Sequence, residues 1–350
     1  MSSSKIKSDE PVIGIIANST SWENRALLVK ELGEPHDGFF NPMPFTFQRL
    51  RGEIIPLDIQ PNEIETPSGM AKGKVYMTNA VDYLASSDVR DIKVICFTAS
   101  TKRLPGKNGN EVKKRYPDIT FSIGDNATTL SLLRTINHFL DSPDFDRNSR
   151  IVCLGAGFLG TKAIEHLMLR GYREITIISE QKASVLPKNI EVVRSIDDLQ
   201  GDIKLFLSCS HKYKIDPLRF KNLVRPDAVI IDVAVPPGIR HDVFITLPET
   251  VIRIDAGDFF LGDVKYDFLP KILSFPQVGF WYGCFTEAIM LGVARQNGDT
   301  LASHNFFEVN RMNLEKIEEY LRREKVYVPL INFFRPEKSK LLDFQAEPAI

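Results

Sequence analysis

A glycine-rich turn is the clearest motif with a chemical meaning in this chain. Residues 150–155 are typical of a buried strand, and Gly155, Gly157 and Gly160 have the spacing of a dinucleotide-binding turn. The first glycine allows a tight bend, the second lets the backbone approach a pyrophosphate, and the third lets a helix pack against the strand. A tight turn without a cofactor is the alternative. The predicted cofactor contacts in this turn are Gly155, Ala156, Gly157, Phe158, Leu159 and Gly160.

The end of the next strand bears on the choice between NAD and NADP. An acidic residue after this strand (174–179) usually pairs with the ribose 2′-hydroxyl and favours NAD, but Glu180 lies one residue late for that role. Ser179 and Lys182 could instead hold a 2′-phosphate. Ser208, at the end of a later strand, is a further candidate cofactor contact. These residues leave both cofactors open.

Cys284 is the candidate nucleophile. Gly279 and Gly283 precede a helical run, so Cys284 is expected in the first turn of a helix, where amide dipoles favour the thiolate. The alternative is that Cys284 is a small buried apolar side chain. Glu287 lies one turn later and could support the end of this helix or orient a substrate. The alternative is a structural carboxylate whose hydrogen bonds are satisfied within the protein.

Polar side chains at strand ends could assist such a nucleophile. Thr98 and Ser100 end an apolar strand, which is where α/β sheets usually place ligands. They are candidates for oxyanion donation or substrate contact, and Asn126 is a similar candidate. His211 could be a proton donor near a cofactor or simply a surface histidine.

Alternating strands and helices must position these residues. Short apolar runs separated by crossovers predict a two-domain α/β protein with parallel sheets. The expected parts are an N-terminal α/β substrate domain (1–140, with a linker helix over 127–140), a Rossmann dinucleotide-binding domain (141–272), C-terminal helices packing back on the first domain (273–335) and a loosely held tail (336–350).

Local patterns give more detailed expectations. Strands are predicted over 12–20, 54–59, 92–100 and 119–125, and then over 150–155, 174–179, 190–193, 203–208, 228–233 and 251–255. Helices are predicted over 75–86, 162–170, 283–296 and 307–324. Residues 39–47 are expected to be irregular, and Gly69 and Gly73 to lie in a loop.

The composition excludes several classes of protein. The 350 residues include 44 Lys and Arg against 45 Asp and Glu, and a net charge of -1 argues against nucleic-acid binding and docking on anionic lipid. The four cysteines have no metal-site spacing and are expected to be free thiols. The N-terminus lacks a signal-peptide pattern, so we expect a cytoplasmic protein. The longest apolar run, 278–294, is too short for a transmembrane helix.

From about residue 12 to residue 330 the chain resembles the long-chain acyl-[acyl-carrier-protein] reductases, bacterial enzymes that reduce fatty acyl thioesters to aldehydes. The most specific block, 282–291, is similar to the family's Ala-Cys-x-Ala-Glu segment, whose cysteine accepts the acyl group. Further matching segments are 12–33, 96–101, 124–129, the glycine turn, 231–236, 253–257 and 307–317.

The resemblance implies that Cys284 is the acyl-accepting nucleophile and faces a nicotinamide across a cleft between two domains. It implies an acyl carrier protein or coenzyme A thioester as substrate, and favours NADPH, with NADH possible because Glu180 and Lys182 replace an arginine that is frequent in the family. An aldehyde-consuming partner enzyme would fit this product. Acyl length and oligomeric state are not indicated.

Two other functions are compatible with the motifs. One is a two-domain NAD(P) oxidoreductase similar in layout to shikimate dehydrogenase, without covalent catalysis. The sequence shows no Lys and Asp pair at the spacing which that reaction needs, and this function leaves Cys284 without a role. The other is a dinucleotide-binding module that has lost its chemistry.

Overall fold

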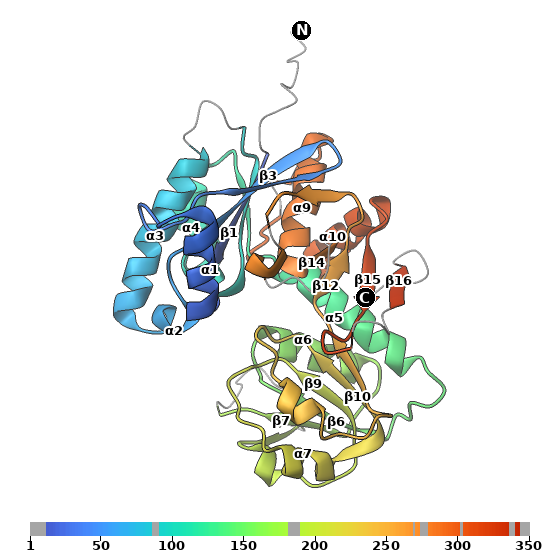
Figure 1. Ribbon diagram of the computed structural model, residues 1–350. Coiled ribbons are helices and arrows are strands. Elements are labelled where there is room, and N and C mark those ends of the chain that lie inside the picture. Colours follow the sequence, from blue (N-terminus) through green and yellow to red (C-terminus); the bar gives the residue numbers. More distant parts are fainter. Residues whose placement is uncertain are drawn as a thin grey trace. The chain divides into compact units, whose positions relative to one another are not determined.

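The computed structural model describes residues 12–85, 91–180, 190–268, 270–273, 279–301, 304–335 and 340–343. The chain divides into two compact units (Figure 1). Unit 1 comprises Met1–Thr128 and Phe259–Val326, and unit 2 comprises Thr129–Asp258 and Tyr327–Ile350. The first division therefore falls inside helix α5 (Asp125–Leu140), and not after residue 140.

Unit 2 is built on a six-stranded parallel sheet with the order β11-β10-β9-β6-β7-β8. Its strands are β6 (Arg150–Leu154), β7 (Ile175–Ile178), β8 (Glu191–Val193), β9 (Ile203–Ser208), β10 (Val224–Asp232) and β11 (Ile252–Asp255). Numbered from β6, this is the order 3-2-1-4-5-6 of doubly wound dinucleotide-binding folds. The predicted α/β class with a Rossmann domain is confirmed.

Helices cover both faces of this sheet. Alternate residues of each strand point to opposite faces, so Ile151 packs in a cluster with α5 and α6 (Phe158–Leu169), where Ile136 and Leu167 are buried. Val152 packs on the other face with α7 (Pro217–Leu223) and α8 (His241–Phe244). The central strands β6, β7 and β9 are therefore almost entirely buried, as the sequence suggested.

Unit 1 contains a mixed six-stranded sheet with the order β13-β2-β3-β1-β4-β5. The strands β3, β1, β4 and β5 are parallel, and β2 and β13 continue the sheet in antiparallel pairing. Its strands are β1 (Ile13–Asn18), β2 (Met43–Phe47), β3 (Leu50–Leu57), β4 (Val94–Phe97), β5 (Thr120–Ser122) and β13 (Val264–Tyr266).

Two long helices cover opposite faces of this sheet. A Cβ at Gly14 would lie 2.5 Å from Leu84 of α3 (Pro67–Ala85), so α3 packs closely on one face of β1. A Cβ at Gly292 of α9 (Gly283–Gln296) would lie 2.5 Å from Ile13, the neighbouring residue of β1. Because neighbouring strand residues point to opposite faces, α3 and α9 enclose the sheet from two sides.

Shorter elements complete the described chain. Unit 1 also has α1 (Trp22–Leu32), α2 (Pro61–Ile64), α4 (Asn110–Arg115), α10 (Arg311–Arg323), β14 (Phe280–Tyr282) and the 3-10 turns η1 (Ala99–Arg103), η2 (Lys107–Gly109) and η4 (Pro270–Leu273). Unit 2 also has η3 (Ile196–Asp198), β15 (Tyr327–Leu330) and β16 (Lys340–Asp343), and β12 (Asp258–Phe260) lies at the second division. No helix in the described ranges is long and apolar enough to cross a membrane.

Three local expectations were wrong. Residues 43–47 form β2, because Met43, Phe45 and Phe47 alternate into the core although prolines interrupt the pattern. Gly69 and Gly73 belong to α3, where a Cβ at Gly69 would lie 2.0 Å from the Glu63 carbonyl oxygen. In the tail, 340–343 pairs with β15 as β16 and is not loosely held; the rest of the tail lies outside the described residues.

Candidate active site and dinucleotide site

The glycine turn of unit 2 has the geometry that a dinucleotide requires. Gly155 has a φ of +96°, which a side chain would disfavour. A Cβ at Gly160 would lie 2.0 Å from the Gly155 carbonyl oxygen, so the helix packs tightly on the turn. Apart from the residues next to Gly157 along the backbone, no atom of the described chain lies within 4 Å of a Cβ placed on Gly157. The turn therefore leaves open space over its middle glycine.

The surroundings of this turn fit a pyrophosphate-bearing cofactor. Gly157 is the N-cap of α6 and offers no side-chain acceptor to the first helical amides, which are the groups that bind a phosphate. Ser208 ends β9, next to β6, where the strand order reverses. Its hydroxyl is buried and has no hydrogen-bond partner in the described residues. A polar group left in this state is suited to a ligand.

The residues that would separate NAD from NADP are only partly described. Ser179 is nearly buried at the end of β7, and Glu180 is exposed with its amide donating to the Tyr213 hydroxyl at 3.1 Å. Lys182 lies outside the described residues. The predicted preference for NADPH therefore stays a prediction.

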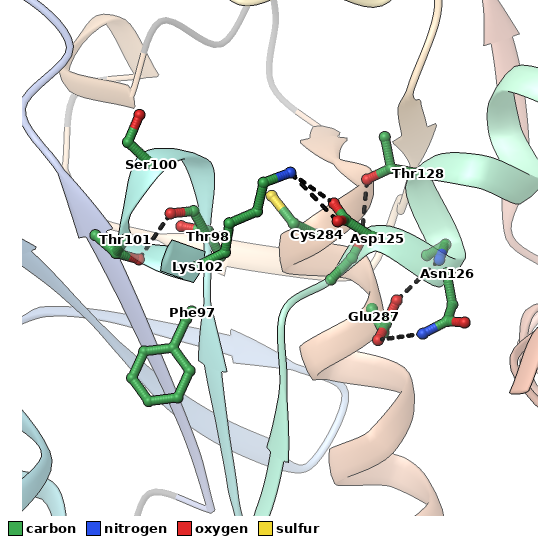
Figure 2. Close-up of polar contacts among 12 residues, drawn as sticks. Phe97, Thr98, Ser100, Thr101, Lys102, Asp125, Asn126, Thr128, Cys284 and Glu287 are labelled. Atoms are coloured by element: carbon green, nitrogen blue, oxygen red, sulfur yellow. Dashed lines mark hydrogen bonds and ion pairs between the residues drawn. The ribbon is translucent and has the colours of Figure 1, made fainter. Parts of the chain in front are cut away.

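Cys284 occupies the predicted position in the first turn of α9. It is partly exposed, and all four cysteines are free thiols, as expected. A Cβ at Gly124 would lie 2.2 Å from the Cys284 Cβ, so the loop after β5 approaches the cysteine as closely as a glycine allows. The buried Cys96 thiol of β4 donates to the Cys284 carbonyl oxygen at 3.3 Å. Cys284 is thus fixed against β4 and the start of α5 (Figure 2).

Glu287 is a buried carboxylate that holds the start of α5. It accepts hydrogen bonds from the Ser122 hydroxyl, from Asn126 Nδ2 at 3.2 Å and from the Ala127 amide at 2.9 Å. Glu287 lies in α9 but holds the start of a different helix, α5, so in the structure it is a hydrogen-bonded structural carboxylate. Burial raises the pKa of Glu287 from 4.5 to about 7.

This pKa makes stability depend on pH. The folded protein keeps the Glu287 proton up to about pH 7, whereas the unfolded chain loses it near 4.5. The folded state binds more protons in that window, so the free energy of unfolding falls as pH rises from about 5 to 7, by at most about 3 kcal/mol. In Glu287→Gln this decrease in the free energy of unfolding should be smaller. Urea unfolding of both proteins at pH 5, 6, 7 and 8 would measure the decrease. The same dependence of the free energy of unfolding on pH in both proteins would contradict the expectation.

The polar residues considered as oxyanion donors, substrate contacts or proton donors differ in burial and in hydrogen bonding. The buried Thr98 hydroxyl donates to the Ile16 carbonyl oxygen at 3.1 Å, and the buried Asn126 amide serves Glu287. Ser100 is partly exposed, and its backbone amide donates to Asn18 Oδ1 at 3.1 Å. His211 is exposed, in unit 2. Ser100 is therefore the candidate of unit 1 whose side chain is accessible to a substrate.

A lysine–aspartate pair stands at the same site. Lys102 Nζ lies 2.9 Å from Asp125 Oδ1 and 3.3 Å from Oδ2 (Figure 2). The expectation that the chain lacks such a pair was wrong, because it considered spacing along the sequence. Lys102 follows β4 and Asp125 follows β5, and these neighbouring parallel strands bring the two residues to one sheet edge. The signal in the sequence that could have revealed this pair is that Lys102 and Asp125 each follow closely on the end of a predicted strand.

No family model and no curated protein matches the chain. Among solved structures, it is similar to a dipicolinate synthase protein from Bacillus halodurans, with 15% identity and a TM-score of 0.33 over 46% of this chain and 57% of that chain. It is also similar to a dipicolinate synthase protein from Bacillus subtilis, with 12% identity and a TM-score of 0.34 over 71% of this chain and 72% of that chain. A shikimate 5-dehydrogenase-like protein is similar with 9% identity and a TM-score of 0.34 over 90% of this chain and 98% of that chain. The chain thus spans little more than half the length of the Bacillus halodurans protein.

Proposed function

We propose that the protein is an NAD(P)H-dependent oxidoreductase that reduces a fatty acyl thioester to the aldehyde through an acyl-cysteine intermediate on Cys284. The observation that carries this proposal is the place of Cys284, a partly exposed thiol in the first turn of the 14-residue helix α9. The amide dipoles at that end favour the thiolate, which is the nucleophilic form. The glycine turn of unit 2 supplies the second requirement, a dinucleotide site.

Covalent catalysis divides the proposed reaction into two steps. The Cys284 thiolate attacks the thioester carbonyl, a new C–S bond forms, and the carrier thiolate leaves. A dinucleotide held at the glycine turn would supply the hydride that reduces the acyl-cysteine carbonyl. The resulting hemithioacetal collapses to the aldehyde, and the electron pair of the broken C–S bond returns to Cys284. Both steps place negative charge on an oxygen that needs a donor or a cation.

Other residues of this chain would bind the cofactor and keep Cys284 in place. The turn from Gly155 to Gly160 and the Ser208 hydroxyl would hold the dinucleotide, with NADPH as the proposed form and NADH as the alternative. Glu287 would keep α5 and α9 in register, so that Gly124 stays against Cys284. The proposed substrate is carried by acyl carrier protein or coenzyme A, and an aldehyde-consuming enzyme would take the product.

The test is to incubate the purified protein with acyl thioesters of short, medium and long chains in the absence of NADPH. Intact mass with peptide mapping should show an acyl adduct on Cys284, because hydride transfer cannot follow. Addition of NADPH should clear the adduct and release the aldehyde. A protein that carries no adduct for any chain length on either carrier would contradict covalent catalysis.

A second candidate function is direct reduction of a carbonyl compound without a covalent step. The Lys102–Asp125 pair is the observation that favours it, because an ammonium held beside a substrate can protonate the carbonyl oxygen, which takes up the π electron pair of the C=O bond when hydride adds to the carbon. In that reaction Cys284 has no chemical role. Turnover of a Cys284→Ala protein therefore distinguishes the two functions.

A further inference from the structure

We infer that Lys102 is the cationic group of the Cys284 site: its ammonium stabilises the negative charge that acylation places first on sulfur and then on the thioester oxygen. Asp125 is the positioning residue that fixes this ammonium. This inference rests on the proposed function and adds a residue to it. The ammonium keeps its protons throughout, so it balances the charge as this moves from the Cys284 sulfur to the carbonyl oxygen and then to the departing carrier sulfur.

A short chain of contacts places Lys102 at the cysteine. Its Nζ contacts both carboxylate oxygens of Asp125, at 2.9 and 3.3 Å. Asp125 directly follows Gly124, on which a Cβ would lie 2.2 Å from the Cys284 Cβ and 2.4 Å from its Cα. Figure 2 shows the Lys102 side chain extending from η1 toward Asp125 and Cys284.

The acidic groups near the Cys284 thiol disfavour its thiolate form unless a cation lies close to it. Burial is the main cause that raises the pKa of the Cys96 thiol well above its ordinary value, and the nearby acidic groups of Glu287, Cys284 and Asp125 add to it. The carboxyl groups of Glu287 and Asp125 therefore lie near the Cys284 thiol in unit 1. A further negative charge on the Cys284 sulfur is disfavoured there unless an opposite charge is close, and Lys102 supplies one.

Exposure suits Lys102 to this role. Its side chain is 34% exposed, whereas that of Asp125 is 8% exposed. The aspartate is thus a fixed anchor in the protein, and the ammonium remains accessible to a substrate oxygen. A cation paired on one side can still accept a second anion, because an ammonium has three donors.

Alkylation of Cys284 measures this charge effect without substrate or cofactor. The rate of Cys284 modification by iodoacetamide, followed by peptide mapping, should rise with pH about a midpoint. In Lys102→Met and Lys102→Gln the midpoint should move up by about one pH unit, and acylation by a thioester should slow by about tenfold or more. Lys102→Arg keeps the charge and should keep the midpoint.

Asp125→Asn gives a readout that a structural disturbance would not reproduce. It removes a negative charge near sulfur, so the alkylation midpoint should stay or fall, yet acylation should slow because the ammonium loses its anchor. Lys72→Met is the matched control, since it removes a comparable ion pair of unit 1, Lys72–Glu63 at 3.2 Å. It should change neither quantity.

The outcomes separate this inference from the proposed function. If the wild-type protein is acylated but both neutral Lys102 variants match Lys72→Met in midpoint and in acylation rate, the inference is overturned and the proposed function stands. If the wild-type protein forms no adduct, the proposed function fails. An unmoved alkylation midpoint in Lys102→Gln would by itself remove Lys102 from the site.

Discussion

Replacing Cys284 with alanine should abolish aldehyde formation from acyl thioesters while leaving dinucleotide binding intact. The thiolate is the group that accepts the acyl chain, so we expect turnover to fall on the order of 1000-fold or more. The glycine turn lies in unit 2, and Cys284 lies in unit 1. Steady-state aldehyde production and a calorimetric cofactor titration would measure the two effects separately.

Cys284→Ser is the matched variant for this experiment. Serine has nearly the same volume as cysteine and preserves the contact with Gly124, but its hydroxyl does not ionise near neutral pH. If Cys284 acts as the nucleophile, serine should lose turnover almost as completely as alanine. If Cys284 only fills space in α9, serine should restore activity. Full turnover in both variants would favour direct carbonyl reduction with Lys102 as the acid.

Gly157→Val should remove dinucleotide binding without destabilising the fold. Gly157 has an ordinary φ of -70°, and apart from its neighbours along the backbone no described residue lies within 4 Å of an added Cβ. A valine side chain would instead occupy the space where the pyrophosphate meets the first amides of α6. We expect the cofactor dissociation constant to rise about 100-fold, which corresponds to the cost of overfilling a packed site.

Gly201→Val controls for the substitution itself. Gly201 is an exposed position of the same unit, where a Cβ would approach nothing closer than the Asn222 carbonyl oxygen at 3.6 Å. Both variants should keep the wild-type melting temperature, and only Gly157→Val should lose cofactor binding. Wild-type affinity in Gly157→Val would show that the turn does not receive the dinucleotide in the proposed way.

Features with a local physical cause could be predicted from the sequence. The six strands of the parallel sheet in unit 2 follow from apolar runs, and the turn at Gly155 follows from the need for a positive φ between a strand and a helix. The first-turn position of Cys284 follows from Gly283 and the helical run after it. Each of these depends on residues within about one turn or one strand.

Features that depend on pairing between distant segments could not be predicted. The strand β16 exists because it pairs with β15, and Met43–Phe47 is a strand because β3 and β13 lie on either side of it. Strand formation at such positions is decided by neighbours and burial more than by the residues themselves.

The sequence by itself determined the α/β class, the dinucleotide turn and the candidate nucleophile, because glycine geometry and apolar periodicity act over short distances. Only the tertiary structure decided what surrounds that nucleophile. Lys102 and Asp125 are 23 residues apart, and Glu287 is 160 residues from the Ala127 amide that it holds. Lys102 and Asp125 meet because the parallel strands β4 and β5 end at a common sheet edge, and Glu287 meets Ala127 because α9 packs on these strands. Both arrangements are properties of the packed sheet.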